Sequence, residues 1–479
     1  MNRQRETGVY LTVTAIFTTL IAFLLQAGHR LRPLVAVATR PFTPAASPDF
    51  WATLRAGWHT PAALLLAQLL VILLAARLLG SLCRRVGQPA VVGEMAAGIL
   101  LGPSLLGRVW PAGAAALFPA SSLDNIRVLS QMGLMLFMFA VGLDLDWRAI
   151  RGKARQAVVI SHASILVPFA LGLGLAYGLY AEFAPAGVPF AAFGLFLGTA
   201  MSVTAFPVLA RIVRERGLHL TPLGSLVLTC AAADDVTAWV ILAAVIALVR
   251  AGSAGSTLGL VALTVAYAGL MMGMVRPLLA RLGRPLTAGG KLRRAALPTF
   301  FLTLIASAFV AEAIGIHALF GAFLAGAIMP PDGRLRELLS GKVQDVAVLL
   351  LLPLFFVLAG LRTQLGLLNS GYLWGMCALI TAVAVVGKLL GSALAARLVG
   401  IAWPDSLRIG VLMNTRGLMG IVILNIGYDL GILSPAIFTM MVVMALATTC
   451  MTGPGLNLLA RWPASETEAA AEKPASARI

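Results

Sequence analysis

Charged residues are scarce in this sequence. Only 11% of its 479 residues are charged and 59% are hydrophobic, whereas soluble globular chains carry roughly a quarter charged residues. This composition excludes an ordinary soluble protein. Apolar runs of about twenty residues recur along the chain, each long enough to cross a hydrocarbon layer about 30 Å thick. We therefore expect an all-α polytopic membrane protein that has the lipid bilayer as its main partner.

Cysteine and acidic residues are also scarce. The four cysteines are far apart and show no C-x-x-C spacing, so a disulfide framework and a zinc site are excluded and free thiols are expected. These are Cys83, Cys230, Cys377 and Cys450. The net charge of +17 comes from short basic clusters between apolar runs. Such clusters set membrane topology, and we expect no nucleic-acid partner.

The apolar runs predict one leading helix and thirteen core helices. The leading helix covers about residues 9–26, where a cleaved signal peptide is the alternative. The core helices, numbered one to thirteen, begin near residues 61, 89, 126, 157, 188, 222, 255, 296, 317, 343, 371, 405 and 434. We thus expect a leading helix with an extracytoplasmic loop (1–60), a transmembrane domain (61–458) and a cytoplasmic tail (459–479).

Basic clusters give the predicted orientation. They follow the odd-numbered core helices, as Arg84 and Arg85 follow the first and Arg214 and Arg216 follow the fifth. By the positive-inside rule these connections are cytoplasmic, although the arginine-containing loop before core helix one is an exception. Both termini should therefore be cytoplasmic, in a bacterial inner membrane.

Two pairs of core helices share sequence patterns at an offset of seven helices. Helix two reads GEMAAGILLGP over residues 93–103, and helix nine reads GAFLAGAIMP over 321–330. The pattern LF-x4-GL occurs at 136–143 in helix three and at 354–361 in helix ten. An odd offset predicts an inverted repeat, as in many secondary transporters. Chance recurrence of small residues is the alternative.

Ionisable residues within the predicted spans are few, and each is a functional candidate because charge is costly in lipid. They are Glu94, Asp234, Asp235, Glu312, Lys388 and Arg416, with His317 nearby.

Asp234 and Asp235 lie side by side near the middle of core helix six. Adjacent helical residues point about 100° apart, so one carboxylate can face a cavity while the other faces a neighbouring helix. Burial and mutual repulsion favour proton binding, and carboxylate oxygens also suit a hard alkali ion. The pair predicts a site where protons and a cation compete. A structural pair capping neighbouring amides is the alternative.

Lys388 lies within core helix eleven, with apolar residues on both sides. It is too deep to extend its amine to the membrane surface, so it needs an acidic partner, and the two aspartates are the chief candidates. We expect Lys388 to couple charge when a cation takes its partner. A static salt bridge is the alternative.

Core helices five and twelve are predicted to be interrupted. In helix five, Pro207 removes an intrahelical hydrogen bond, and Ser202 and Thr204 supply hydroxyl groups, although a simple proline kink is the alternative. The corresponding polar residues of helix twelve are Asn414, Thr415 and Arg416. Interrupted helices place half-helix ends at a site near the membrane centre.

Glu94 and Glu312 are predicted to form structural ion pairs with Arg416 rather than to bind the ion. His317 is predicted to be a packed or capping residue near a helix end.

Taken in order, these motifs are similar to those of the second monovalent cation:proton antiporter family. They are QPAVVGEMAAGILLGPSLLG from residue 88, SVTAFPVLARI from 202, AAADDVTAW from 231, GIHALFGAF from 315, GKLLGS from 387 and MNTRGLMGIVILNIG from 413. The chain most resembles the plant-type cation/H+ exchanger (CHX) branch and its bacterial relatives, over about residues 60–458.

The resemblance implies the NhaA-like inverted-repeat fold, with two crossing discontinuous helices, assembled as a homodimer. It implies a scaffold and dimerisation part at about 61–145 and 296–365, and a moving transport part at about 156–250 and 371–458. No cofactor and no appended nucleotide-binding domain are expected.

The resemblance also assigns the site. Asp235 would be the principal cation- and proton-binding carboxylate and so hold the alkali cation, Asp234 would pair with Lys388, and Thr204 would be a supporting ligand. Two aspartates with a lysine resemble the electrogenic members. Plant-type relatives commonly have asparagine at position 234, so this chain departs from them there.

These expectations predict a secondary active transporter, not an enzyme, that exchanges Na+ or K+ for protons by alternating access and serves pH homeostasis. A sodium-coupled solute symporter on the same fold is the alternative. An intramembrane aspartyl protease fits poorly, because such enzymes carry their two catalytic acids on facing helices, whereas Asp234 and Asp235 are adjacent on one helix. A channel fits poorly with a buried site that titrates protons.

Overall fold

Helices are the only regular secondary structure in the part of the chain that the computed structural model describes. That part comprises residues 60–144, 154–218, 221–251, 254–286, 296–330 and 346–459, with four single residues ahead of position 60. Nine helices there are long and apolar enough to cross a membrane, and four shorter ones are also apolar. The expected polytopic membrane protein is confirmed. The predicted leading helix, apart from those four residues, and the predicted tail beyond residue 459 lie outside the described residues.

Six helices from two separate stretches of the described chain pack together, and we call them group one. They are α3 (Pro61–Arg85), α4 (Ala90–Leu101), α7 (Ala120–Asp144), α15 (Ala296–Ile314), α16 (Ala318–Ala327) and α18 (Leu352–Arg362). Helix α4 lies against α3 and α18, and α16 lies against α7 and α15. Short elements accompany this group: α5 (Leu106–Val109), α6 (Pro111–Leu117) and η4 (Ala347–Leu351). The short η5 (Leu365–Leu367) follows α18 and lies against α22 (Pro435–Leu459).

Glycine pairs allow the closest approaches in group one. A Cβ atom added to Gly98 of α4 would lie 2.8 Å from the Cα of Gly360 in α18. One added to Gly142 of α7 would lie 3.0 Å from the Cα of Gly326 in α16. Because no side chain fits at these points, the backbones of the two helices touch directly, which is typical of helix packing in membranes.

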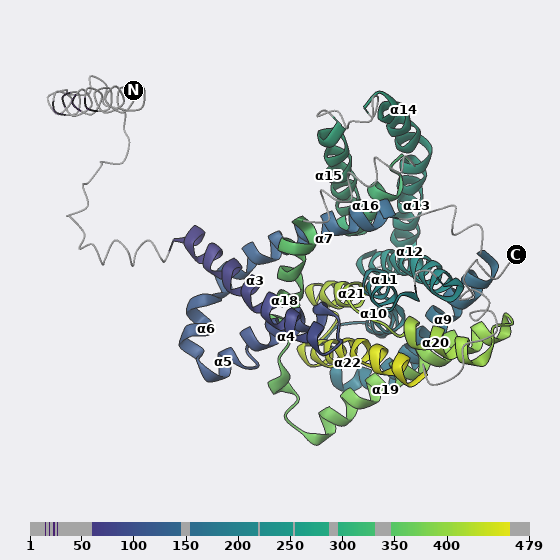
Figure 1. Ribbon diagram of the computed structural model, residues 1–479. Helices are drawn as coiled ribbons and strands as arrows, with labels where there is room; N and C mark the ends of the chain where they lie inside the picture. The colour runs from purple at the N-terminus through teal and green to yellow at the C-terminus, as the bar shows by residue number, and fades with distance from the viewer. Residues whose placement is uncertain are drawn as a thin grey trace, which may run out of the picture. The chain divides into compact units, whose positions relative to one another are not determined.

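Eight further helices form group two around the centre of Figure 1. They are α9 (Ala154–Phe183), α10 (Phe190–Ser202), α11 (Phe206–Glu215), α12 (Pro222–Ala251), α19 (Gly371–Leu398), α20 (Trp403–Met413), α21 (Leu418–Asp429) and α22 (Pro435–Leu459). Helix α9 lies against α10, α12 and α19, and α22 lies against α19, α20 and α21. The connection to group one runs through α13 (Ala254–Leu270), η2 (Met271–Val275) and α14 (Arg276–Leu286).

Two predicted core helices are interrupted in the structure, and both lie in group two. Residues 203–205 separate α10 from α11, and residues 414–417 separate α20 from α21. Pro207 lies in the first turn of α11, where its missing N–H needs no partner. The break in core helix five is therefore more than a proline kink.

The described helices begin close to the predicted positions, and the predicted start of core helix ten near residue 343 lies outside the described residues. The largest difference is at core helix three, which was expected near residue 126 and begins at Ala120. Its first turns contain the polar residues Ser121, Ser122, Asp124 and Arg127, so a search for apolar runs does not detect the start of the helix. Pro119 directly precedes the helix, and its carbonyl oxygen accepts from the backbone N–H of Ser122 at 2.9 Å.

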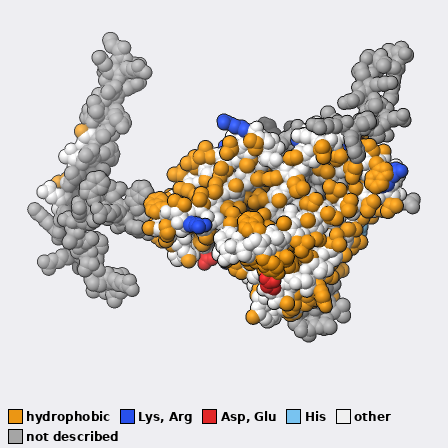
Figure 2. Space-filling model, turned by 90° about the horizontal axis from the view of Figure 1, so that it is seen from below, with side chains coloured by type: hydrophobic (Ala, Val, Ile, Leu, Met, Phe, Trp, Pro, Cys, Tyr) orange, Lys and Arg blue, Asp and Glu red, His pale blue; other side chains and the backbone are white. Residues whose placement is uncertain are grey.

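The outer surface of the described helices is apolar. On α3, exposed leucines recur at every fourth position, at Leu66, Leu70, Leu74, Leu78 and Leu82. This spacing keeps them on one face of the helix, where they suit contact with lipid. Figure 2 shows the same character, since hydrophobic side chains dominate the visible described surface.

Candidate functional site

The two helix interruptions lie in contact with each other. The backbone N–H of Ala205 donates to the carbonyl oxygen of Thr415 at 3.1 Å. The Thr204 hydroxyl lies 3.1 Å from the carbonyl oxygen of Met413, the last residue of α20. Backbone groups inside a membrane must find partners within the protein, so each unwound segment satisfies part of the other.

Asp234 lies on α12 beside these interruptions, with its side chain fully buried. Its Oδ1 accepts a hydrogen bond from the Ser161 hydroxyl at 2.5 Å. Its Oδ2 lies 2.8 Å from the hydroxyls of Ser164 and Thr204. Both oxygens of this carboxylate are therefore engaged by hydroxyl groups from two different helical segments, α9 and the break after α10.

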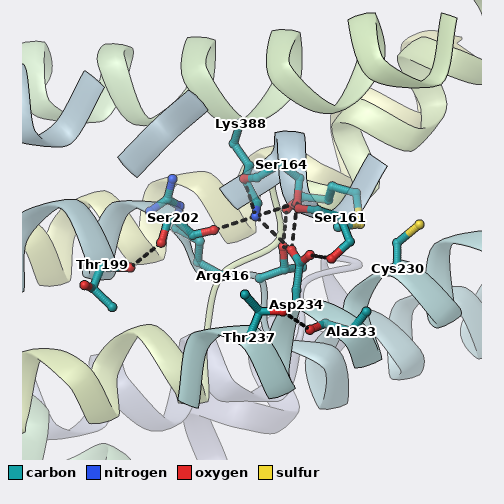
Figure 3. Close-up of polar contacts among 12 residues, drawn as sticks. Ser161, Ser164, Thr199, Ser202, Cys230, Ala233, Asp234, Thr237, Lys388 and Arg416 are labelled. Carbon is teal, nitrogen blue, oxygen red and sulfur yellow. Dashed lines mark hydrogen bonds and ion pairs between the residues drawn. The ribbon is translucent and has the colours of Figure 1, made fainter. Parts of the chain in front are cut away.

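Lys388 completes the surroundings of Asp234 from α19. Its Nζ lies 3.0 Å from Asp234 Oδ2 and also donates to the carbonyl oxygens of Ser164 at 2.9 Å and Ser202 at 2.6 Å. Figure 3 shows Lys388, Ser164 and Asp234 converging at this point. The ion pair expected between Lys388 and Asp234 is present, and three acceptors match the three N–H bonds of an ammonium group.

Asp235 differs sharply from its neighbour. Its side chain is only 2% exposed, yet neither carboxylate oxygen has a hydrogen-bond partner among the described residues. The backbone amide of Phe206, at the N-terminus of α11, lies close to this carboxylate without hydrogen-bonding geometry. A helix N-terminus carries partial positive charge and so offers some stabilisation to an anion. The side-chain oxygens of Asn414 and Ser392 are also buried without a partner in the described chain.

Arg416, in the second interruption, is held by backbone rather than by carboxylates. Its Nη1 donates to the carbonyl oxygen of Ala200 at 3.1 Å, and its Nη2 donates to that of Ala384 at 3.2 Å. Ala200 lies in the last turn of α10, where carbonyl groups lack intrahelical partners and attract a cation. The Thr449 hydroxyl in turn donates to the carbonyl oxygen of Arg416.

Arg416 thus has backbone carbonyl partners, whereas ion pairs with the two glutamates were expected. The Glu312 carboxylate accepts from the backbone N–H of Ala318 at 2.7 Å and so caps α16. Glu94 lies half-buried on α4 in group one. The backbone N–H of Ala318 has no partner within α16, and the Glu312 carboxylate lies only six residues earlier in the chain. This local contact is favoured over an ion pair with Arg416, which is far away in sequence.

His317 is the N-cap of α16, as its predicted capping role requires, with a backbone φ of 82° and a side chain that accepts from Leu319 N–H. All four cysteines are free thiols, as expected. Ser202 contributes its carbonyl oxygen to Lys388, while its hydroxyl bonds to Thr199.

Sequence reasoning missed the contribution of α9. Ser161 and Ser164 are fully buried and both bind Asp234. The available signal was their spacing, because two hydroxyl residues three apart on an apolar helix lie on one face. The same applies to Thr449 and Thr452 on α22, which contact the interruption at Arg416 and Thr415.

The arrangement places two carboxylates and two cationic side chains in one buried region. Asp234 and Lys388 neutralise each other, and Arg416 stabilises helix ends. Asp235 is left as a carboxylate whose oxygens can accept a proton or a hard cation without displacing a protein partner. Chemically, the site is suited to reversible binding of small positive ions.

Comparisons with known proteins agree with these features. A family described as "Sodium/hydrogen exchanger, transmembrane" matches residues 69–462. The chain is 44% identical to the Na(+)/H(+) antiporter NhaS4 of Synechocystis, covering 82% of this chain and 96% of that protein. It is 34% identical to K(+)/H(+) antiporter 1 of Saccharomyces cerevisiae, covering 83% of this chain and 47% of that longer protein.

A plant relative and a solved structure are also similar to this chain. Cation/H(+) antiporter 18 of Arabidopsis thaliana is 38% identical, with 82% of this chain and 48% of that protein covered, so the chain spans about half of these two eukaryotic relatives. The fold is similar to that of the sodium proton antiporter MjNhaP1 from Methanocaldococcus jannaschii, with a TM-score of 0.63 at 14% identity, covering 84% of this chain and 99% of that one. The chain belongs to the sodium/hydrogen exchanger transmembrane family.

Proposed function

We propose that this protein exchanges a monovalent cation, Na+ or K+, for protons across a bilayer as a secondary active transporter. Family membership supports this function, as do relatives named for Na+/H+ and K+/H+ antiport. The observation that carries it is the buried Asp235 carboxylate, which has no hydrogen-bond partner on either oxygen among the described residues.

Asp235 is the proposed carrier of both ions. A bare carboxylate is expensive to move through a low-dielectric interior, and binding either a proton or a cation removes its charge. Only loaded forms therefore cross cheaply, and exchange follows from that restriction. Asn414 offers a further buried oxygen that has no hydrogen-bond partner among the described residues, and the unwound segments offer backbone carbonyls.

Asp234, Lys388 and Thr204 have supporting roles in this proposal. Asp234 and Lys388 form a neutral pair that fixes α12 to α19. Thr204 ties the first interruption to Asp234 and leaves its oxygen lone pairs for a cation. Ser202, Pro207, Thr415 and Arg416 shape the interruptions.

An inverted repeat of the NhaA-like kind accounts for the glycine contacts of group one. The sequence patterns align Gly98 with Gly326 and Gly142 with Gly360. The observed contacts are Gly98 with Gly360 and Gly326 with Gly142, so each contact maps onto the other when the halves are exchanged. A second pair of contacts corresponds in the same way. Gly93 lies against the backbone of Leu79 and Gly80, and Gly321, its counterpart in the other repeat, lies against that of Ser307 and Ala308. These pairs support thirteen core helices with crossing interruptions, six of them repeated and the seventh connecting the repeats.

Alternating access is the proposed mode of movement. Group one corresponds to the scaffold and group two to the transport part, and we propose that group two moves against group one in a homodimer. The basic clusters support cytoplasmic termini in an inner membrane, and transport needs no cofactor. The relatives described above are named antiporters, so the solute symporter considered from sequence gains no support.

Asp235→Asn tests the proposed carrier. In inverted vesicles, a pH-sensitive dye should report cation-induced proton movement for the unaltered protein and none above background for the variant, since asparagine cannot exchange a proton. Glu182→Gln, the same chemical change at an exposed residue of α9, is the matched control and should retain exchange. Retained exchange in Asp235→Asn, with normal amounts of folded protein, would overturn the assignment.

A further inference from the structure

Arg362 joins group one to group two at a point remote from the carrier site. It is the last residue of α18, and its side chain is 12% exposed. Its Nη2 lies 2.9 Å from Asp429 Oδ1, and its Nη1 donates to Asn425 Oδ1 at 2.7 Å. The guanidinium also lies over the ring of Tyr428, 5.5 Å from the ring centre.

The three partners of Arg362 form one face of α21. Residues 425, 428 and 429 are spaced i, i+3 and i+4, which places them side by side on a helix. An arginine fork can engage two acceptors at once and stack on an aromatic ring, a combination that lysine cannot reproduce. The three contacts together therefore hold α18 to α21 at one defined position.

A second contact between the groups supports the same junction. The backbone N–H of Gln364, two residues after Arg362, donates to the Thr439 hydroxyl of α22 at 3.1 Å. Arg127 of α7 adds positive charge at 3.9 Å from Asp429. Two segments of group one, the end of α18 and the start of α7, thus converge on the ends of two helices of group two.

This junction is mechanically linked to the carrier site through α21. The helix begins directly after the interruption that contains Arg416 and ends at Asp429. Its 12 residues span about 18 Å as a rigid rod. Holding its far end against α18 therefore fixes the position of the interruption at its near end.

We propose that Arg362 and Asp429, with Asn425 and Tyr428, form a latch that closes one side of the transporter and must open in every cycle. The inference rests on the proposed alternating access of group two against group one. In the proposed orientation, α18 and α21 end on the extracytoplasmic side, so the latch is closed when the site is shut off from that side. Opening it exchanges the arginine's protein partners for water.

Reversible crosslinking tests the latch. Arg362→Cys and Asp429→Cys are combined in a chain whose four native cysteines are replaced by serine, and a reducible bifunctional thiol reagent joins the pair in proteoliposomes. Cation-induced proton movement should fall at least tenfold on crosslinking and return on reduction. The control pair, Glu182→Cys with Tyr372→Cys, joins α9 to α19 within group two and should transport equally well with and without the crosslink.

The outcomes separate the latch from the function on which it rests. Transport that survives complete crosslinking of positions 362 and 429 would overturn the latch alone, whereas absence of exchange in the unaltered chain would refute the proposed function. Asp429→Asn decides the matter if the double variant is inactive before crosslinking. Loss of one partly exposed ion pair should shift apparent cation affinity about fivefold, in opposite directions at the two membrane faces, as expected for about 1 kcal/mol. Unchanged affinity at both faces would overturn the latch, and Asp405→Asn, which breaks an ion pair within α20, is its control.

Discussion

Replacing Asp234 with asparagine should destabilise the protein far more than the same replacement of its neighbour Asp235. Both side chains are buried on one turn of α12, and both changes remove one negative charge with little change in volume. The difference lies in their partners. Asp234 is bound by two serines, a threonine and Lys388, whereas Asp235 has no hydrogen-bond partner among the described residues.

The size of the effect can be estimated from these contacts. Breaking a buried ion pair by removing one partner costs about 3–5 kcal/mol, because the other charge stays buried without compensation. Lys388 retains the carbonyl oxygens of Ser164 and Ser202, which favours the lower end, about 3 kcal/mol. Asp235→Asn removes an unpaired carboxylate and should be neutral or slightly stabilising.

Thermal unfolding in one detergent at one pH measures the order of stabilities. Asp234→Asn should unfold at the lowest temperature, and Asp235→Asn at or above that of the unaltered protein. Combining Asp234→Asn with Lys388→Met should recover part of the loss, because no unpaired charge remains. Equal unfolding temperatures for the two single variants, or full additivity in the double variant, would refute the unequal roles of these residues.

Two further predictions concern packing and pH. Gly98→Ala should destabilise the protein by about 2 kcal/mol, because the added Cβ would lie 2.8 Å from Gly360 Cα. Gly174→Ala is the control, since its Cβ would meet open space and should leave stability unchanged. Thermal unfolding of both variants checks this, and equal stability of the two would contradict it. The apparent affinity for the cation should fall as pH falls, since protons compete for the Asp235 carboxylate. Dye assays at several cation concentrations over a series of pH values measure this affinity. An affinity that does not change with pH would contradict the competition.

The sequence predicted most of the helical frame because lipid imposes strong constraints on it. Apolar run length located the helices. Pro207 with neighbouring hydroxyl residues located the first interruption, and Asn414, Thr415 and Arg416 located the second. The start of α7 was predicted six residues late because that end is polar, and hydropathy alone does not detect a helix that extends beyond the hydrocarbon. Which helices pack together depends on long-range contacts such as Gly98 with Gly360, and the repeated patterns gave the only indication of these.

The site was predictable where charge was involved and less so elsewhere. Ionisable residues in apolar spans are conspicuous, so both aspartates, Lys388 and Arg416 were identified. Ser161 and Ser164 were missed because buried serines are common in membrane helices and carry no charge. The backbone partners of Arg416 were not predicted, because the carbonyl groups at the end of α10 lack intrahelical partners only once helix five is broken.

The unequal surroundings of the two aspartates bear on how many charges move. If the Asp234–Lys388 pair stays intact through the cycle, Asp235 alone is loaded and one proton is exchanged for one monovalent cation. Lys388 can leave Asp234 at reduced cost because it keeps two backbone carbonyl oxygens, those of Ser164 and Ser202. Asp234 likewise keeps three hydroxyl donors when Lys388 turns away. Each partner therefore has enough hydrogen bonds of its own to exist briefly without the other. A lysine that couples a second charge to transport must meet this requirement, whereas a lysine that is only a static support need not.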